Sequence, residues 1–306
     1  MGIKILVCDH IEDRGIERLR QVGFEVDVNS EISREQLEGT IANYDAIIVR
    51  SRTKVTREII DCGKRLKAIG RAGAGLDNID VEAARERGIT ILNTPEAPAE
   101  AVAELTIGLI LSLARRIPLA DQTMKEGRWL KKDFEGWQLE GKTLGLIGLG
   151  NIGVKVARIA KGFGMRILIT KRIPPDPGLL RELKAEFVPL KDLLKGSDIV
   201  SLHVPLTDQT HKMIGAKEIN MMKDGAFLIN TSRGAIIDEE ALLDALESGK
   251  IGGAALDVYE TEPPKDSRLI RLSNVVCTPH IGAQTEEAQK DASILIAEKI
   301  IKLFSK

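Results

Sequence analysis

Short apolar segments rich in β-branched residues alternate with helical segments along most of the chain. Such alternation favours βαβ units, in which parallel strands are joined by right-handed helical crossovers. It runs from the first residues to about residue 92 and restarts at residue 143, after a long apolar helix predicted over 100–116. We therefore expect an α/β protein with two doubly wound parallel-sheet domains, Rossmann-like or flavodoxin-like. The predicted strands are 3–8, 25–28, 46–50, 67–71, 90–92, 143–149, 166–170, 199–202, 226–230, 253–257 and 275–278.

Length and charge limit the classes of partner. A chain of 306 residues is long enough for two domains, and we expect the boundary near residue 98. Lys plus Arg number 44 against 45 for Asp plus Glu. This balance predicts no nucleic-acid or membrane partner, and no apolar segment is long enough for a membrane span.

The cysteines bear on the compartment and on metal binding. Cys8, Cys62 and Cys277 are odd in number and widely spaced. We expect reduced, buried thiols in a cytoplasmic protein, with no metal site.

A glycine-rich turn follows the strand predicted at 143–149. Gly148, Gly150 and Gly153 fit the pattern in which the first glycine allows the tight turn, the second admits the pyrophosphate and the third lets helix and strand pack closely. The start of the next helix, with Asn151 and Ile152, adds free N–H groups and a positive dipole end. The turn predicts a dinucleotide site.

The residues after the next strand bear on which dinucleotide binds. An acidic residue that would hold the adenosine ribose is missing there, and Lys171 and Arg172 stand in its place. Two cations attract a 2′-phosphate, so we expect NADP to be accepted. The alternative is a solvated basic turn on a protein that uses NAD.

Three later strands end in residues suited to chemistry. Segment 230–234 (NTSRG) carries an arginine, 257–263 (DVYETEP) carries acids and 278–282 (TPHIG) carries a histidine. Ligands of open α/β sheets bind outside the carboxyl ends of the strands, so these segments are candidates for one shared site.

These segments together resemble the D-isomer-specific 2-hydroxyacid dehydrogenases, and within that family the D-3-phosphoglycerate dehydrogenases. The resemblance extends over essentially the whole chain. Besides the glycine turn and the three strand ends, it rests on 49–55 (VRSRTKV), 70–80 (GRAGAGLDNID), 102–108 (VAELTIG) and 203–205 (HVP).

The resemblance implies three catalytic residues. His280 corresponds to the base that takes the hydroxyl proton while a hydride leaves to nicotinamide, and imidazole suits this because it titrates near neutral pH. Glu262 corresponds to its acidic partner, which favours the imidazolium and fixes the ring tautomer. Arg233 corresponds to the arginine that holds the substrate carboxylate, for which a guanidinium is well shaped.

The resemblance also implies binding residues and a domain assignment. It predicts a substrate-binding domain over 1–98 plus 284–306 and a dinucleotide-binding domain over 99–283. Glu96 departs from the family pattern, in which many members have glycine. Further cofactor contacts are implied for His203, Pro205, Thr231, Asp257 and Gly282. Substrate contacts are implied for Arg50, Ser51, Arg52, Arg71, Ala74 and Gly75, of which the first three resemble a phosphate-binding corner.

The function expected from this resemblance is hydride transfer between NAD or NADP and a D-2-hydroxy acid. The leading substrate is 3-phosphoglycerate, as in serine biosynthesis. An NADPH-linked glyoxylate or hydroxypyruvate reductase is the alternative enzyme, and a dinucleotide-sensing scaffold like the C-terminal binding protein corepressors is the alternative of another class. We also expect a homodimer, formed through an arm over 100–141, and no serine-binding regulatory domain beyond Lys306.

Overall fold

A computed structural model describes residues 2–265 and 267–305. The chain divides into two compact units, Met1–Ala99 with Ala283–Lys306, and Glu100–Gly282. Both are built on sheets whose neighbouring strands are all parallel. This confirms the predicted α/β fold with two doubly wound sheets.

The first unit has a sheet of order β2-β1-β3-β4-β5 among the described residues. Its strands are β1 (Lys4–Val7), β2 (Glu25–Val28), β3 (Ala46–Val49), β4 (Ala68–Arg71) and β5 (Thr90–Asn93). Its helices are α1 (Asp13–Gln21), α2 (Arg34–Thr40), η1 (Ile41–Asn43), α3 (Arg57–Cys62), α4 (Val81–Glu86) and α12 (Glu286–Phe304).

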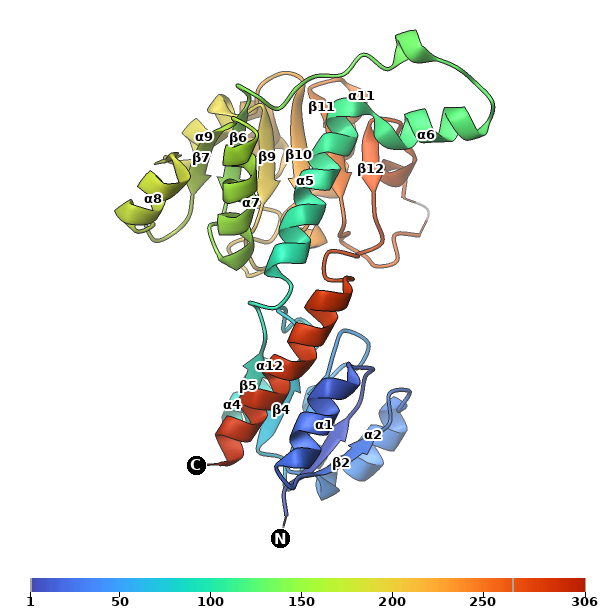
Figure 1. Cartoon of the computed structure of the whole chain (residues 1–306), viewed down its shortest axis with the longest axis vertical. Helices are drawn as coiled ribbons and strands as arrows, with labels where there is room; N and C mark the ends of the chain where they lie inside the picture. Colours follow the sequence, from blue (N-terminus) through green and yellow to red (C-terminus); the bar gives the residue numbers. More distant parts are fainter. Residues whose placement is uncertain (1, 266, 306) are drawn as a thin grey trace. The chain divides into compact units, whose positions relative to one another are not determined.

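Both faces of this sheet are covered, because side chains alternate along its strands. Ile5 and Ile48 point to the face covered by α1 and α12, where Ile296 and Ile300 are fully buried. The opposite face packs against α2, α3 and α4. Figure 1 shows α12 lying alongside α1, although nearly the whole chain separates them in sequence.

The second unit has a sheet of order β12-β11-β10-β9-β6-β7-β8 among the described residues. Its strands are β6 (Thr143–Ile147), β7 (Arg166–Thr170), β8 (Ala185–Phe187), β9 (Ile199–Leu202), β10 (Ala226–Asn230), β11 (Ile251–Leu256) and β12 (Val275–Cys277). Its helices are α5 (Ala99–Arg115), α6 (Ile117–Lys125), η2 (Lys131–Asp133), α7 (Asn151–Gly162), α8 (Pro177–Leu183), α9 (Leu190–Gly196), α10 (Ala216–Met221), η3 (Gly234–Ile236), α11 (Glu239–Glu247) and η4 (Leu269–Arg271).

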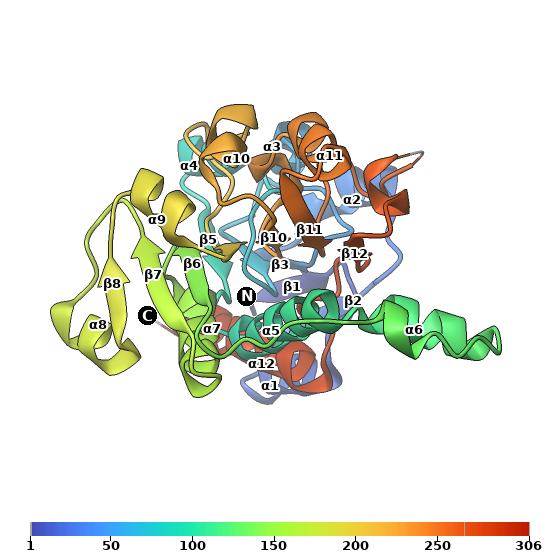
Figure 2. The same cartoon turned by 90° about the horizontal axis from the view of Figure 1, so that it is seen from above.

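Two cores lie on opposite faces of this sheet. Helices α5 and α7 cover one face, and α9, α10 and α11 cover the other, as Figure 2 shows. The order of the strands reverses between β6 and β9, so the loops after these two strands flank a switch point at the carboxyl edge.

Helix α6 and the segment after it extend away from the rest of the second unit (Figure 1). Trp129 is 76% exposed in this arm, and Ile117 and Met124 are also exposed. Within the part of the chain that the structure describes, no helix is both long and apolar enough to cross a membrane.

The prediction of three buried cysteines is wrong for two of them. Cys8 is buried at the end of β1, but Cys62 is only half-buried and Cys277 is exposed. Cys277 ends β12, an edge strand of the seven-stranded sheet, where one side has no neighbouring strand to cover it.

Candidate active site

The glycine turn between β6 and α7 is shaped by steric constraints at two positions. Gly148 has φ +99°, and a Cβ there would lie 2.3 Å from the carbonyl oxygen of His203. A Cβ on Gly153 would lie 2.6 Å from the carbonyl oxygen of Gly148. Larger residues at either position would push apart the turn, the helix and the loop after β9.

The amino end of α7 faces open space rather than a capping side chain. Gly150 is the N-cap residue, makes no side-chain cap bond, and has no other atom within 4 Å of where a Cβ would lie. Asn151, exposed, and Ile152, half-buried, begin the helix. Free N–H groups at a helix N-terminus bind phosphate well, so these residues fit a dinucleotide pyrophosphate.

Lys171 and Arg172 lie directly beside this turn. Thr170, the last residue of β7, accepts a 2.8 Å hydrogen bond from the backbone N–H of Gly148. Lys171 is half-buried and Arg172 is exposed. Both cations thus follow the end of β7, next to the glycine turn.

His203 and Pro205 follow β9 on the other side of the turn. His203 is half-buried, its Nε2 lies 2.9 Å from Ser201 Oγ, and desolvation lowers the pKa of the imidazole to about 4. The ring is therefore neutral at pH 7. Pro205 is exposed, and its carbonyl accepts a bond from the Thr210 hydroxyl.

His280 and Glu262 form a side-chain pair. The Nδ1 of His280 lies 2.8 Å from Glu262 Oε2, and Glu262 Oε1 accepts a 3.2 Å bond from the backbone N–H of Tyr259. The His280 side chain is 48% exposed. With Nδ1 facing the carboxylate, Nε2 is the ring nitrogen left for a substrate.

Asp257, at the end of β11, holds the turn that carries His280. Its carboxylate is 1% exposed and accepts bonds from the Thr278 hydroxyl at 2.7 Å and from the backbone N–H groups of Ile281 and Gly282 at 2.8 and 2.9 Å. The structure thus shows Asp257 and Gly282 in a bond that shapes the histidine turn.

The segment after β10 places Arg233 close to the Glu262 loop. A Cβ on Gly234 would lie 1.8 Å from the backbone carbon of Tyr259, so the two loops pack backbone to backbone. Thr231 is buried and its hydroxyl lies 3.0 Å from that of Thr106 on α5. The three strand-end segments predicted from the sequence therefore contact one another in series within the second unit.

The loop after β3 in the first unit carries Arg50, Ser51 and Arg52 beside the β1/β3 switch point. The Arg52 guanidinium donates to the carbonyls of Ser30 and Ile32 at 2.6 and 3.2 Å. It also donates to the carbonyl of Cys8 at 2.5 Å and lies 3.1 Å from the buried Asp9 carboxylate. Arg52 thus connects several loops, whereas the half-buried Arg50 guanidinium donates a long hydrogen bond of 3.4 Å to the His10 carbonyl.

Arg71, Ala74 and Gly75 follow β4 in the same unit. The Arg71 guanidinium folds back over its own loop and donates to the Ala72 carbonyl at 3.0 Å. The Ala74 carbonyl accepts a 2.7 Å bond from the Asn93 amide, and Gly75 is half-buried.

Glu96 pairs with a cation of the last helix. Its carboxylate lies 2.6 Å from Lys299 Nζ of α12, which also donates to the Asn93 carbonyl. This ion pair lowers the pKa of Glu96. The departure from the family pattern at this position thus adds a contact within the first unit.

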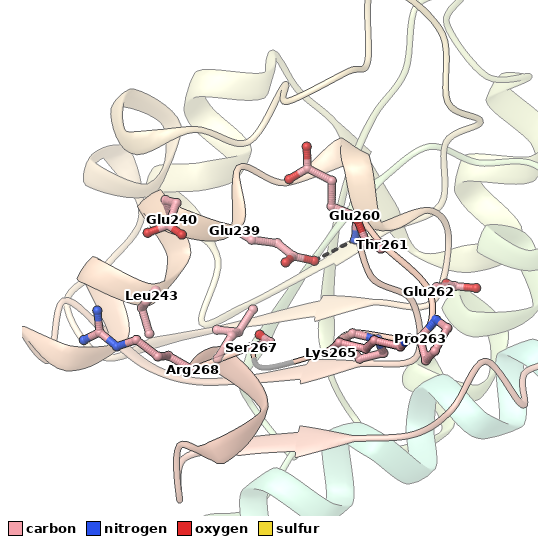
Figure 3. A pocket seen from close by; sticks show the side chains of 12 residues that line it. Glu239, Glu240, Leu243, Glu260, Thr261, Glu262, Pro263, Lys265, Ser267 and Arg268 are labelled. Carbon is pink, nitrogen blue, oxygen red and sulfur yellow. Dashed lines mark hydrogen bonds between the residues drawn. The ribbon is translucent and has the colours of Figure 1, made fainter.

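A cavity of about 610 Å³ lies beside the Glu262 loop (Figure 3). It is lined by α11 and by residues of the segment after β11, including Glu239, Glu260 and Arg268. Glu262 also lines it, whereas Arg233 and His280 do not. Among the described residues, no group of three or more His, Cys, Asp or Glu could hold a metal ion.

Other residues shape these loops without having been predicted: Asp9 in the first unit, and Thr106, Asn230, Ser232 and Tyr259 in the second. Each works through hydrogen bonds to backbone groups or to a residue distant in sequence, for which no local pattern is diagnostic. All but Asp9 lie inside segments named from the sequence, at 102–108, 230–234 and 257–263, but the segments alone assign them no role.

Residues 107–282 match the model of the NAD-binding domain of the D-isomer specific 2-hydroxyacid dehydrogenases. The chain belongs to this family. The match includes the glycine turn, both members of the His280–Glu262 pair, and Arg233.

Individual relatives of the chain have different names. It is 49% identical over 99% of its length to a D-3-phosphoglycerate dehydrogenase of Methanocaldococcus jannaschii, of which it spans 57%. It is 51% identical to a hydroxypyruvate reductase of Thermotoga maritima, with 91% of each chain covered. The crystal structure of a glyoxylate reductase from Paecilomyes thermophila has a TM-score of 0.93 and 36% identity, over 100% of this chain and 96% of that one.

Proposed function

We propose that this protein transfers a hydride between NAD or NADP and a small D-2-hydroxy acid. The observation that carries the proposal is the His280–Glu262 pair, 2.8 Å apart, on a loop packed against the Arg233 segment. A base, its carboxylate partner and a carboxylate-binding guanidinium are what alcohol oxidation beside a nicotinamide requires.

His280 takes the hydroxyl proton at Nε2 during oxidation and returns it during reduction. Glu262 stabilises the imidazolium formed in between, because a carboxylate at Nδ1 favours the charged ring. Arg233 binds the substrate carboxylate and polarises the neighbouring oxygen. Bound NAD(P) supplies the hydride acceptor or donor, while the first turn of α7 holds its pyrophosphate.

The remaining predicted contacts complete the dinucleotide site in this proposal. The cofactor is contacted in this proposal by His203, Pro205, Thr231, Asp257 and Gly282. In this proposal Lys171 and Arg172, which follow β7 beside the glycine turn, pair with a 2′-phosphate, so NADP is accepted.

The leading substrate is 3-phosphoglycerate, oxidised to 3-phosphohydroxypyruvate in serine biosynthesis. Support comes from the similarity to a D-3-phosphoglycerate dehydrogenase and from Arg50, a half-buried cation at a switch point of the first sheet. Arg71, Ala74 and Gly75 are proposed to receive the substrate carboxylate.

A second candidate is the reduction of hydroxypyruvate or glyoxylate with NADPH. Two observations favour it besides the names of relatives. The Arg52 guanidinium is engaged with backbone carbonyls and Asp9, which leaves less positive charge for a phosphate. Lys171 and Arg172 suit NADPH.

One assay separates the candidates. The purified protein is offered 3-phosphoglycerate with NAD or NADP, and hydroxypyruvate or glyoxylate with NADH or NADPH, while absorbance of the reduced nicotinamide is followed. Turnover of 3-phosphoglycerate supports the leading substrate. Reduction of hydroxypyruvate without turnover of 3-phosphoglycerate would replace it by the second candidate.

We further propose that the protein acts in the cytoplasm as a homodimer formed through the arm of residues 100–141. An exposed Trp129 with exposed Ile117 and Met124 forms an apolar surface of the kind that protein interfaces cover. Trp129→Ser should shift the mass measured by light scattering towards the monomer.

A further inference from the structure

The side chain of Asn230 bonds twice to the backbone of the segment that carries Arg233. Its Oδ1 accepts a 3.0 Å bond from the backbone N–H of Ser232, and its Nδ2 donates a 2.8 Å bond to the carbonyl of Arg233. The residue is 0% exposed. Both polar ends of a buried amide are thus used on two consecutive residues of one loop.

The strand beneath this amide is a rigid support. Asn230 is the last residue of β10, where it pairs with Leu202 of β9 and Leu256 of β11. Its carbonyl also accepts a 2.9 Å bond from the backbone N–H of Asp257. The amide therefore fixes the loop after β10 relative to a strand that is itself paired on both edges.

The same loop also holds the guanidinium of Arg233. Arg233 Nη1 donates a 2.7 Å bond to the carbonyl of Ser232, and Ser232 is one of the two residues that Asn230 holds. Ser232 Oγ additionally bonds to the Val204 carbonyl, and Gly234 packs on Tyr259. Three contacts thus hold the backbone around Arg233: the two bonds of the Asn230 amide, the bond from Ser232 to Val204, and the packing of Gly234 on Tyr259.

We propose that Asn230 is a positioning residue: it fixes the Arg233 guanidinium in the orientation that binds the carboxylate of the substrate. This inference rests on the role proposed above for Arg233. Displacing a substrate-binding group by about 1 Å can cost about 10²-fold in rate. Loss of the amide should therefore reduce substrate binding and catalysis more than dinucleotide binding.

The test compares two substitutions at Asn230 with a matched control. Asn230→Ala removes both bonds. Asn230→Asp keeps an acceptor for the Ser232 N–H but opposes the Arg233 carbonyl with a second oxygen. Ser197→Ala is the control, because Ser197 is equally buried in the same unit and loses one bond, to Leu193, at the amino end of β9.

We expect both Asn230 variants to lower kcat/KM by about 10- to 100-fold, with a higher KM for the 2-oxo acid and a lower kcat. The affinity for reduced dinucleotide, measured by its fluorescence, should change by less than about twofold. A general loss of folding would lower both kcat/KM and this affinity. The control should keep its kcat/KM. If Asn230→Ala does not fold by circular dichroism, Asn230→Asp carries the test.

A double-mutant cycle shows whether Asn230 acts through Arg233. In an Arg233→Lys background, Asn230→Ala should lower the remaining kcat/KM by less than about threefold. An equal effect in both backgrounds, or a parallel loss of dinucleotide affinity, would overturn the inference.

Oxalate binding separates this inference from the proposed function. Oxalate, which resembles a 2-oxo acid carboxylate, is titrated into the protein loaded with reduced dinucleotide, and the nicotinamide fluorescence is followed. Absence of turnover with every 2-oxo acid would count against the proposed function alone. Weaker oxalate binding in the Asn230 variants would still support the inference, and unchanged binding would contradict it.

Discussion

Asp257→Asn should damage both stability and catalysis, because one buried carboxylate holds the whole histidine turn. An asparagine oxygen can replace the oxygen that accepts from Thr278 and Ile281, but its amide group would then face the N–H of Gly282. One bond to a charged group, worth about 1.5–3 kcal/mol, is lost, and a buried donor is left unsatisfied at about 1–3 kcal/mol.

We therefore expect a loss of about 3 kcal/mol in the free energy of unfolding. For a unit of this size it corresponds to a melting temperature lower by about 6–12 °C. A displacement of His280 by about 1 Å would in addition reduce kcat/KM by about 10²-fold. Thermal unfolding and steady-state kinetics measure the two effects separately.

Asp198→Asn is the matched control. The Asp198 carboxylate accepts 2.8 Å bonds from the Thr143 backbone N–H and from Lys223, at the opposite end of the same sheet. It should lose stability and keep kcat/KM. If Asp257→Asn lowers the melting temperature but leaves kcat/KM within about threefold of the wild type, the histidine turn does not depend on Asp257 as argued here.

Three further outcomes follow from the site. Replacing Lys171 and Arg172 by Ala should raise the KM for NADP by about 10²–10⁴-fold, since each of two charged hydrogen bonds contributes about 1.5–3 kcal/mol. The KM for NAD should stay within about twofold of the wild type, and a parallel rise in both would contradict the 2′-phosphate contact. Burial lowers the pKa of His203 from 6.5 to about 4. Between these two pH values the unfolded chain binds a proton at this imidazole that the folded chain does not bind. The free energy of unfolding should therefore be fully retained above about pH 6.5 and decrease as the pH falls towards 4. Between pH 7 and 4.5 the melting temperature of His203→Gln should therefore decrease less than that of the wild type. Equal decreases would refute this. His280→Ala should lower kcat by about 10²–10⁴-fold with unchanged circular dichroism and dinucleotide affinity, and wild-type turnover would exclude it as the base.

Most of the strands were predictable because they are short, apolar and largely buried, as β1, β3, β6 and β9 are. The predicted segments at β2, β7, β9 and β10 match the observed bounds, whereas the strand at β6 was predicted too long. It ends at Ile147 because Gly148 adopts φ +99°, which strand geometry does not allow. The three-residue strand β8 was missed, since its half-buried and exposed residues carry no strong alternation.

The candidate site was predictable only as residue types at strand ends. The order of the sheet brings those ends together, and the resemblance supplied the roles. The sequence could not reveal which groups each side chain hydrogen-bonds to. Arg50 and Arg52 look equivalent in the sequence, yet Arg52 bonds to Ser30, Ile32 and Cys8, contacts that depend on loops distant in the chain.

The placement of α12 affects how the protein folds during synthesis. Ile296 and Ile300 complete a core whose strands lie within residues 1–99, but the ribosome makes the 183 residues of Glu100–Gly282 in between. Synthesis proceeds at about 5–20 residues per second, so the apolar face that α12 covers stays exposed for about 10–40 s. The first unit can thus complete its core only after the second unit has been made, whereas the second unit is one continuous stretch of chain.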